Sequence, residues 1–276
     1  MSAVARGRRL VADRLRRLGL AGVGRLAGNP AVAERLHALL AAADGDWRQP
    51  DPARASLFAV TGPGGINWVV LADGGKRCAI RLRLDAGASG NIIYVGHGSD
   101  QPRAVHCEGS GNTLLIGDAA RWCVLDVRFV SSAAVVAVGR GSIFNGTSII
   151  AEGDGCGVTI GEGGLFAPGT TIRNSDLHGL YALDDDRWLN PPAPVVIEPY
   201  VWFGQDALVL KGAHVGGGSV VAARSVVMGP TPRFAVVAGT PARPLRTGVC
   251  WALERTPNRT ALPRIRQLLG EPASAD

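Results

Sequence analysis

Residues 197–227 read IEPYVWFGQDALVLKGAHVGGGSVVAARSVV, and an apolar residue returns at every sixth position of this stretch. The apolar series is Ile197, Phe203, Val209, Val215, Val221 and Val227, and a small or β-branched residue follows four places after each of its first five members: Val201, Ala207, Ala213, Ser219 and Ser225. Two shorter runs have the same spacing: Ile160, Phe166 and Ile172, then Val138, Phe144 and Ile150. A six-residue period is neither helical nor a simple strand alternation, and it predicts a parallel β-helix built from hexapeptides.

The hexapeptide pattern also predicts the inside of the prism. Each apolar residue points inward, the small residue fills a corner, and three hexads close a coil of about 18 residues. Successive coils stack at about 4.8 Å, the ordinary spacing between strands. Such a prism is narrow, which agrees with 38 glycines and only 5% aromatic residues in the chain.

The texture of the chain divides it into four segments. Residues 1–50 form a predicted helical segment, with helix over most of 1–45, and 51–135 an irregular β region with degenerate N-terminal coils. Residues 136–230 form the regular hexapeptide β-helix, interrupted by a loop insertion over 176–194. Residues 231–276 form a connector and C-terminal helices, which would cover the open edge of the last coil.

The positive charge of the chain is confined to its first 25 residues. Seven arginines and one acid, Asp13, stand there, and together they make the whole formal surplus of +6. The remaining body has no basic stripe with interleaved aromatics, so we expect no nucleic-acid partner. Residues 1–28 could rest on an anionic membrane surface, but a helix packed on the body with a solvated charged face is the favoured interpretation.

The cysteines and the apolar runs bear on the compartment. Five cysteines without a CxxC pair indicate reduced thiols and a cytoplasmic protein. No apolar run reaches the 18 or so residues of a membrane span. The first 30 residues lack the apolar centre of a signal peptide, because Asp13 and several arginines interrupt it.

The insertion over 176–194 is where we expect the chemistry. Long irregular insertions in a rigid repeat are usually functional. This one holds His178, one of five histidines in the chain, and Trp202 follows it at an outward hexad position. We expect no metal site, because the histidines lack the spacing of a three-histidine zinc centre and Asp184–Asp186 fit a solvated loop tip.

Five short motifs carry a family resemblance: SDLHGLY (175–181), VWFG (201–204), LKG (210–212), VGGGSVVAARSVV (215–227) and AGTPARPLR (238–246). In these the chain resembles the hexapeptide-repeat acetyltransferases, most of all the capsular polysaccharide and sialic acid O-acetyltransferases and the xenobiotic acetyltransferases. The resemblance is close over about 136–251 and absent from the N-terminal helices. It departs from the family at Phe203 and Thr240. It implies a left-handed β-helix, a homotrimer with active sites between subunits, and acetyl-CoA as cosubstrate.

The same resemblance implies roles for single residues. His178 would be the general base, and Trp202 would lie against the acceptor or the acetyl end of the cosubstrate. The pantetheine arm would follow the coil backbone near Gly204, Ala222 and Ala223. The phosphates of the coenzyme would meet three basic side chains: Lys211, Arg224 and Arg243. From chemistry alone, an imidazole suits removal of a hydroxyl proton, and Asp176 is a candidate to orient it.

These observations favour an acetyl-CoA-dependent O-acetyltransferase that acts on a hydroxyl of a capsular or cell-envelope saccharide by direct transfer in a ternary complex. N-acetylation of an amino sugar or nucleotide sugar is the alternative within enzymes. A non-catalytic trimeric β-helix scaffold is the alternative outside them, because fold does not fix function.

Overall fold

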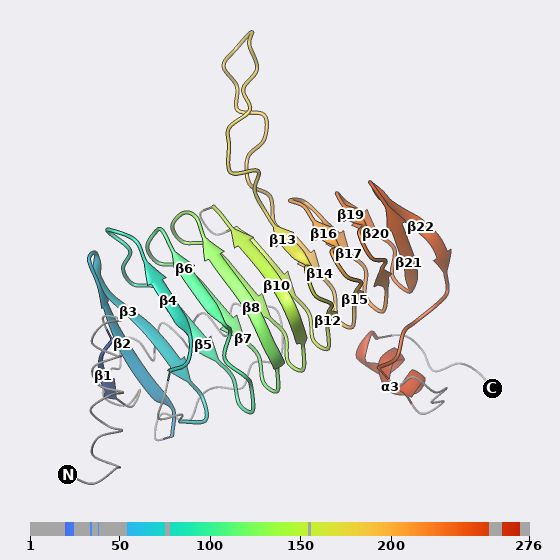
Figure 1. The fold of residues 1–276 in the computed structure, drawn as a ribbon. Helices are drawn as coiled ribbons and strands as arrows, with labels where there is room; N and C mark the ends of the chain where they lie inside the picture. Colours follow the sequence, from blue (N-terminus) through green and yellow to red (C-terminus); the bar gives the residue numbers. More distant parts are fainter. Residues whose placement is uncertain are drawn as a thin grey trace.

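The computed structural model describes residues 20–24, 34, 38, 54–74, 78–153, 156–253 and 261–270. The chain winds into an elongated prism whose strands stack along its length, with one long arm projecting from its side (Figure 1). A hairpin of β2 (Ser56–Gly62) and β3 (Gly65–Leu71) opens the prism, and β1 (Leu20–Gly24) adds to β2 in antiparallel register.

Three faces of parallel strands enclose the core. The first face runs through β3, β5 (Ile92–Val95), β7 (Thr113–Ile116), β9 (Val135–Val138), β11 (Gly157–Ile160), β14 (Val195–Ile197), β17 (His214–Val215) and β20 (Pro230–Thr231). The second runs through β4 (Arg81–Leu84), β6 (Ala104–Cys107), the second halves of β8 (Arg121–Phe129) and β10 (Ile143–Ala151), then β13 (Thr171–Arg173), β16 (Leu208–Val209) and β19 (Val226–Val227). The third runs through the first halves of β8 and β10, then β12 (Leu165–Phe166), β15 (Trp202–Phe203), β18 (Val220–Val221), β21 (Ala235–Gly239) and β22 (Ala242–Thr247).

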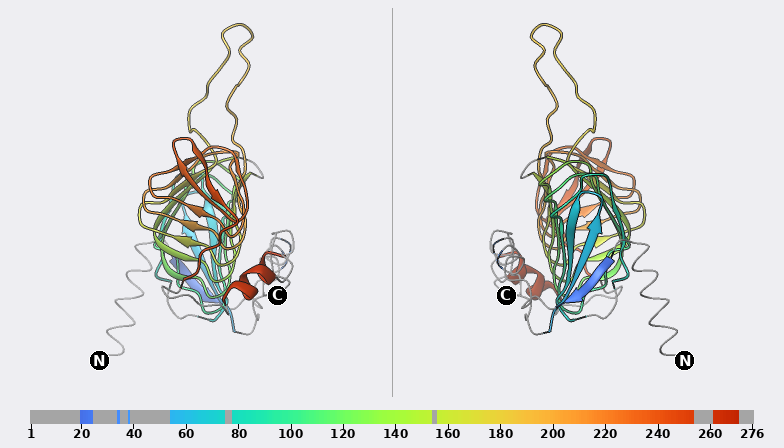
Figure 2. Two further views of the ribbon diagram at one scale, coloured as in Figure 1. Left: turned by 90° about the vertical axis from the view of Figure 1, so that its right-hand side faces the viewer. Right: turned by 90° about the vertical axis from the view of Figure 1, so that its left-hand side faces the viewer.

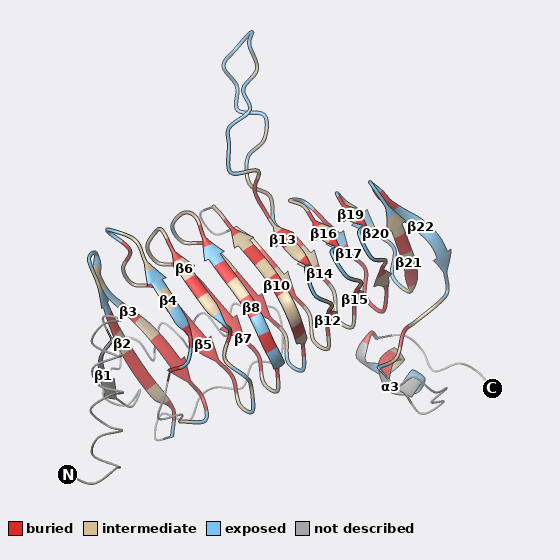
Figure 3. Ribbon diagram, in the orientation of Figure 1, coloured by how far each residue is buried: buried red, intermediate tan, exposed pale blue. Residues whose placement is uncertain are grey.

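The inward positions of the hexads are the core, as the period predicts. All six residues of the main apolar series are buried, and so are the five small residues at the corners. Three of the inward rings form a column along the axis: Phe144 stacks on Phe166 at 4.7 Å and Phe166 on Phe203 at 4.9 Å between ring centroids. Figure 3 shows the resulting bands of buried residues that cross the strands from coil to coil.

One member of the predicted pattern is wrong. In β10 the inward residue is Ile149, which is fully buried and pairs with Ile172, whereas Ile150 is only half-buried. The register of β10 against β8 shifts on both sides of Asn145, so five residues rather than six separate Phe144 from the next inward position. A bulge at the corner therefore moves the pattern by one residue.

The coils also change in length along the prism. Val136 pairs with Val158, 22 residues on, while Phe203 pairs with Val221 only 18 residues on. The 18-residue coil therefore belongs to the part of the prism after the arm, and upstream coils carry extra residues at their corners.

A column of buried asparagines fills one corner of the longer coils. Asn67 Oδ1 accepts from both the backbone N–H and the side-chain Nδ2 of Asn91, at 3.1 and 2.7 Å. Asn91 Oδ1 accepts from the backbone N–H of Asn112 at 2.7 Å, and Asn112 Oδ1 from that of Ala134 at 2.9 Å. The amides satisfy backbone groups that the turn leaves without a ladder partner.

The C-terminal end of the prism differs from the expectation that helices would cover the last coil. Strand β22 pairs antiparallel with β21 and covers its edge. Helix α3 (Ala261–Leu268) lies against the side of the prism instead (Figure 2), where Arg233 Nη2 donates to the Leu269 carbonyl at 2.6 Å. A paired strand satisfies the open edge directly, which a helix cannot do.

The N-terminal expectations are met only in part. Glu34 and Ala38 are helical, but Leu20–Gly24 form β1, where helix was predicted. The rest of the predicted helical segment lies outside the described residues. Apart from β1, so do residues 1–28, for which a packed helix was favoured over contact with a membrane surface. Among the residues that the structure describes, no helix is long and apolar enough to cross a membrane.

Candidate active site

The insertion over 176–194 forms the arm, which leaves the prism at the corner between β13 and β14 (Figure 1). It is a narrow antiparallel ribbon: Tyr181 and Trp188 form a β-bridge, and the N–H of Leu189 donates to the Leu180 carbonyl at 2.7 Å. Most of the arm is exposed (Figure 3), including several large apolar side chains: Leu180, Tyr181, Leu183, Trp188 and Leu189.

The coils on either side of the arm remain in register. Phe166 pairs with Phe203 across 37 residues, 19 more than the 18 that separate Phe203 from its next partner, Val221. The arm therefore enters and leaves the prism at one corner without disturbing the strands.

The neck of the arm is the place where its two strands meet the prism. A clamp of three residues, Asp176, Asn190 and Lys211, closes it. Lys211, at the same corner one coil further on, places its Nζ 2.6 Å from Asp176 Oδ2 and donates to the carbonyls of Asn190 and Pro191 at 2.9 and 3.3 Å. Asn190 Nδ2 donates to Asp176 Oδ2 at 2.9 Å. The hydrogen bonds from Lys211 and Asn190 hold the pKa of Asp176 below its ordinary range.

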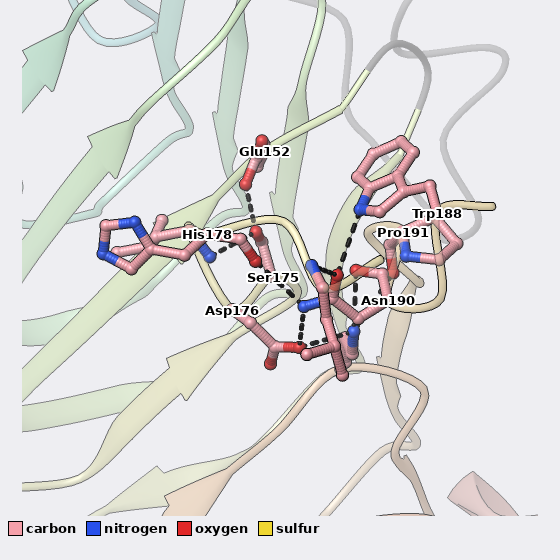
Figure 4. A network of polar contacts seen from close by, with 10 residues as sticks. Glu152, Ser175, Asp176, His178, Trp188, Asn190 and Pro191 are labelled. Atoms are coloured by element: carbon pink, nitrogen blue, oxygen red, sulfur yellow. Dashed lines mark hydrogen bonds and ion pairs between the residues drawn. The ribbon is translucent and has the colours of Figure 1, made fainter. Parts of the chain in front are cut away.

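Asn190 also ties the two strands of the arm together (Figure 4). Its Nδ2 donates to the His178 carbonyl at 2.9 Å, and its Oδ1 accepts from the Leu180 N–H at 2.6 Å and from Trp188 Nε1 at 3.0 Å. With the bond to Asp176, every donor and acceptor of this amide is used.

A second anchor lies beside the neck. The Asn174 side chain accepts from the Glu152 N–H at 2.8 Å and donates to the Glu152 carbonyl at 2.7 Å. Ser175 Oγ donates to the Glu152 carboxylate, and the Leu177 N–H donates to Ser175 Oγ at 3.0 Å. The first residues of the arm are thus fixed to the preceding coil.

His178 stands just past this neck with an exposed side chain. Its imidazole points away from the polar network in Figure 4 and has no polar partner among the described residues. The Asp176 carboxylate, a candidate to orient this ring, binds Lys211 and Asn190 instead. Asp176 therefore makes no direct bond to the ring, and the orienting role predicted for it stays a prediction.

Trp202 lies on another face of the prism. It belongs to β15 of the third face, whereas the arm leaves from the corner between the second and first faces. Its side chain is 39% exposed, and its ring centroid lies 6.2 Å from that of Trp251, which itself stacks on Tyr200 at 4.4 Å. One chain by itself does not bring His178 and Trp202 to the same face.

The residues predicted to hold the coenzyme form two groups. Gly204 stacks under Ala223: a Cβ at Gly204 would lie 2.5 Å from the Ala223 nitrogen, so coil packing alone requires glycine there. Ala223 and Arg224 are exposed at the same corner, and Arg224 Nε lies 3.7 Å from Asp206. Arg243 is exposed on β22.

Lys211 stands apart from that group. Its ammonium already has three partners in the neck of the arm. The contact of Lys211 with the coenzyme stays a prediction. In the structure Lys211 holds the two strands of the arm together at the neck. The sequence reasoning missed Asn190 as a neck residue, because the amide's partners become neighbours only when the arm folds back on itself.

A cluster on the second face resembles a metal site in composition. Asp85, His106 and Glu108 bring three potential ligand atoms within 4.8 Å of one another. Arg83 Nε lies 3.3 Å from Asp85, however, and Arg128 Nε donates to Glu108 at 2.6 Å. Guanidinium groups compensate the carboxylates, so we interpret the group as a surface ion-pair cluster.

Comparisons with known proteins agree on the class. No family model matches the chain. Its relatives include polysialic acid O-acetyltransferases of Escherichia coli O1:K1, 27% identical over 99 residues, and of Neisseria meningitidis, 28% identical over 123 residues. The aligned parts cover 36% and 44% of this chain but only 32% and 56% of those two proteins. An N-acetyltransferase of tetrahydropyridine dicarboxylate from Clostridium perfringens is 48% identical over 61 residues, 21% of this chain and 26% of that protein.

Two solved structures share the fold. The polysialic-acid-specific acetyltransferase NeuO superposes with a TM-score of 0.55 at 24% identity, over 68% of this chain and 91% of NeuO. The polysialic acid O-acetyltransferase OatWY superposes with a TM-score of 0.58 at 20% identity, over 69% of this chain and 96% of OatWY. The predicted fold class, a left-handed parallel β-helix of hexapeptide repeats, is confirmed. So is the resemblance to the hexapeptide-repeat acetyltransferases, in particular those that act on polysialic acid.

Proposed function

We propose that the protein is an acetyl-CoA-dependent O-acetyltransferase that acts on a hydroxyl of a capsular or cell-envelope saccharide, with His178 as general base. One observation carries this: an exposed imidazole stands at the neck of a long arm whose base is fixed to a rigid prism. The names of the polysialic acid O-acetyltransferases that resemble the chain support the reaction class.

Acetyl transfer from a thioester to a hydroxyl requires the protein to position the two substrates and to supply a general base. The acceptor oxygen attacks the thioester carbonyl carbon while the imidazole takes the hydroxyl proton, the C–S bond breaks, and the coenzyme leaves as a thiolate that regains the proton from the imidazolium. The products are an acetyl ester and free coenzyme A. An imidazole suits both transfers near neutral pH, and such a base contributes roughly 10²–10⁴-fold.

Four of the five cysteines favour direct transfer over an acyl-enzyme. Burial, with a smaller contribution from a nearby carboxylate, raises the pKa of Cys107 and of Cys123 to about 12. Burial also raises the pKa of Cys78 and Cys250. A thiol attacks only as its thiolate, so these four groups are poor nucleophiles at neutral pH.

The corner of Gly204, Ala222 and Ala223 fits a pantetheine arm. Its side chains are small, and Ala223 is exposed. The Arg224 guanidinium beside it is largely solvated, and its contact with Asp206 is a loose one at 3.7 Å. Arg224 and Arg243 would bind the phosphates, and acetyl-CoA would supply the activated acyl group. The coil backbone and these arginines would hold it in place.

A complete site on this scheme needs a second copy of the chain. His178 and Trp202 lie on different faces of one prism, and the arm carries exposed apolar side chains such as Leu183 and Trp188 that a neighbouring copy would cover. A homotrimer with each arm against the next prism meets both needs.

Thiol release from acetyl-CoA tests the proposal, with wild type and His178→Ala compared across neutral and acidic oligosaccharides. We expect turnover by the wild type and a loss of about 10²–10⁴-fold in the variant with coenzyme A affinity retained. Equal activity in both would refute His178 as the base. No coenzyme A binding by the wild type would favour the trimeric scaffold.

N-acetylation is the second candidate, favoured by the 48% identity to an N-acetyltransferase over 61 residues. Mild base distinguishes the two reactions, because an ester product loses its acetyl group and an amide keeps it.

A further inference from the structure

The neck of the arm is held by a dense set of side-chain hydrogen bonds centred on Asn190. Asn190 is half-buried and uses all four of its hydrogen-bonding positions: three bond the outgoing strand at Asp176, His178 and Leu180, and one bonds Trp188 on its own strand. Fully satisfied amides of this kind fix one geometry, because any displacement breaks several bonds together. The chain holds this geometry within two residues of the proposed base.

The bonds form a continuous connection from the prism to the base. Lys211 belongs to the coil body between β16 and β17, and its Nζ holds the Asn190 carbonyl and the Asp176 carboxylate. Asn190 in turn holds the His178 carbonyl. Among the described residues this amide is the sole polar contact of His178 with any other part of the arm.

We propose that Asn190, anchored by Lys211, is a positioning residue for His178: it sets the backbone from which the imidazole reaches the acceptor hydroxyl. This inference rests on the function proposed above. Asn190 does not touch substrate in this scheme and acts through His178. A displacement of about 1 Å of a reacting group costs about 10²-fold in rate, so the clamp controls turnover without contributing chemistry.

A double-mutant cycle tests the dependence on His178. In the wild-type background Asn190→Ala is expected to lower kcat about 10–100-fold, with the KM for acetyl-CoA within about twofold. In the His178→Ala background the same substitution is expected to change the residual rate by less than about twofold, because there is no base left to position. Equal losses in both backgrounds would overturn the proposal, since Asn190 would then act independently of His178.

Substitutions of Lys211 give a second test, because its role in the clamp and a role in coenzyme binding predict different kinetic changes. Lys211→Met is expected to lower kcat with little change in the KM for acetyl-CoA, and Lys211→Arg, which can still donate to carbonyls and a carboxylate, to recover part of the loss. A raised KM with kcat unchanged would instead identify Lys211 as a phosphate contact and remove it from the clamp.

Hydrogen exchange supplies a readout that does not depend on activity. In Asn190→Ala the amides of Leu180 and Leu189 should exchange faster, while peptides from the coils should match the wild type. Arg187→Ala is the matched control. Among the described residues its exposed side chain pairs with Asp185 alone, further out on the arm, so wild-type exchange and turnover are expected.

The role of His178 and the clamp can be refuted separately. If His178→Ala is fully active, His178 is not the base, and the proposed role of His178 and the clamp fall together. If His178→Ala is inactive but Asn190→Ala has wild-type turnover and wild-type exchange at Leu180, the proposed function stands and the clamp is wrong.

Discussion

Asn91→Ala would test the asparagine column that fills one corner of the longer coils. The substitution removes three side-chain hydrogen bonds: from Nδ2 to Asn67 Oδ1 at 2.7 Å, from Nδ2 to the Gly109 carbonyl at 3.1 Å, and from the Asn112 N–H to Oδ1 at 2.7 Å. Each such bond contributes about 1 kcal/mol net, and a buried donor left without a partner costs about 1–3 kcal/mol. The Asn112 N–H becomes such a donor, because Asn112 is fully buried. The expected loss is therefore about 3–5 kcal/mol in the free energy of unfolding.

Urea denaturation at a fixed protein concentration, followed by circular dichroism, measures this loss. Asn145→Ala is the control, because Asn145 is half-buried on β10 and its side chain makes no hydrogen bond among the described residues. The control should shift the unfolding free energy by less than about 0.5 kcal/mol. A loss below about 1 kcal/mol for Asn91→Ala, with an unchanged slope against urea, would show that the column does not stabilise the coils and would refute the reasoning.

Three further predictions concern the core, the neck and the thiols. Phe166→Ala should destabilise the protein by about 3–5 kcal/mol, because it removes the middle ring of the stack between Phe144 and Phe203, and Phe166→Leu should cost clearly less; thermal unfolding of the two variants compares them. The pKa of Asp176 is lowered in the folded protein, so its ionised carboxylate stabilises the neck fully above the unfolded carboxyl pKa of about 3.9. This stabilisation is lost as pH falls through the lower folded pKa. Hydrogen exchange at the Leu180 amide should show the loss in the wild type and not in Asp176→Asn. Cys107 and Cys123 should resist iodoacetamide at pH 7.5 in the native protein and react in urea, since both are buried with raised pKa values; rapid native labelling, detected by mass spectrometry, would contradict their burial.

The sequence predicted the prism well because a repeat states its packing rule many times. The six apolar residues of the series from Ile197 to Val227 point inward because each occupies the same place in its hexad. A small corner residue such as Ala207 or Ser219 confirms the phase. The rule fails where a corner takes an irregular number of residues, and Ile149 replaces Ile150 for that reason. Strand β1 was missed because a short segment of Leu, Ala, Gly and Val has no period of its own and forms a strand only by pairing with β2.

The place of the insertion was predictable from the sequence, but the bonds at its base were not. The length of the insertion and its histidine identify the arm as the place of interest. The partners of Lys211 and Asp176 depend on the shape that the arm takes as it returns to the prism, and no period encodes that shape. Lys211 therefore has the neck as its partner, although its place in a motif indicated the coenzyme.

The unchanged register across the arm separates two kinds of evolutionary change. Phe166 and Phe203 pair as closely as neighbours in coils without an insertion, although 37 residues lie between them. Selection can therefore lengthen, shorten or recompose the arm while the strand register of the prism is left intact. The strands of the prism have no such freedom, because a residue gained within a strand would turn the next side chains away from the core, and only the corners of the upstream coils take extra residues.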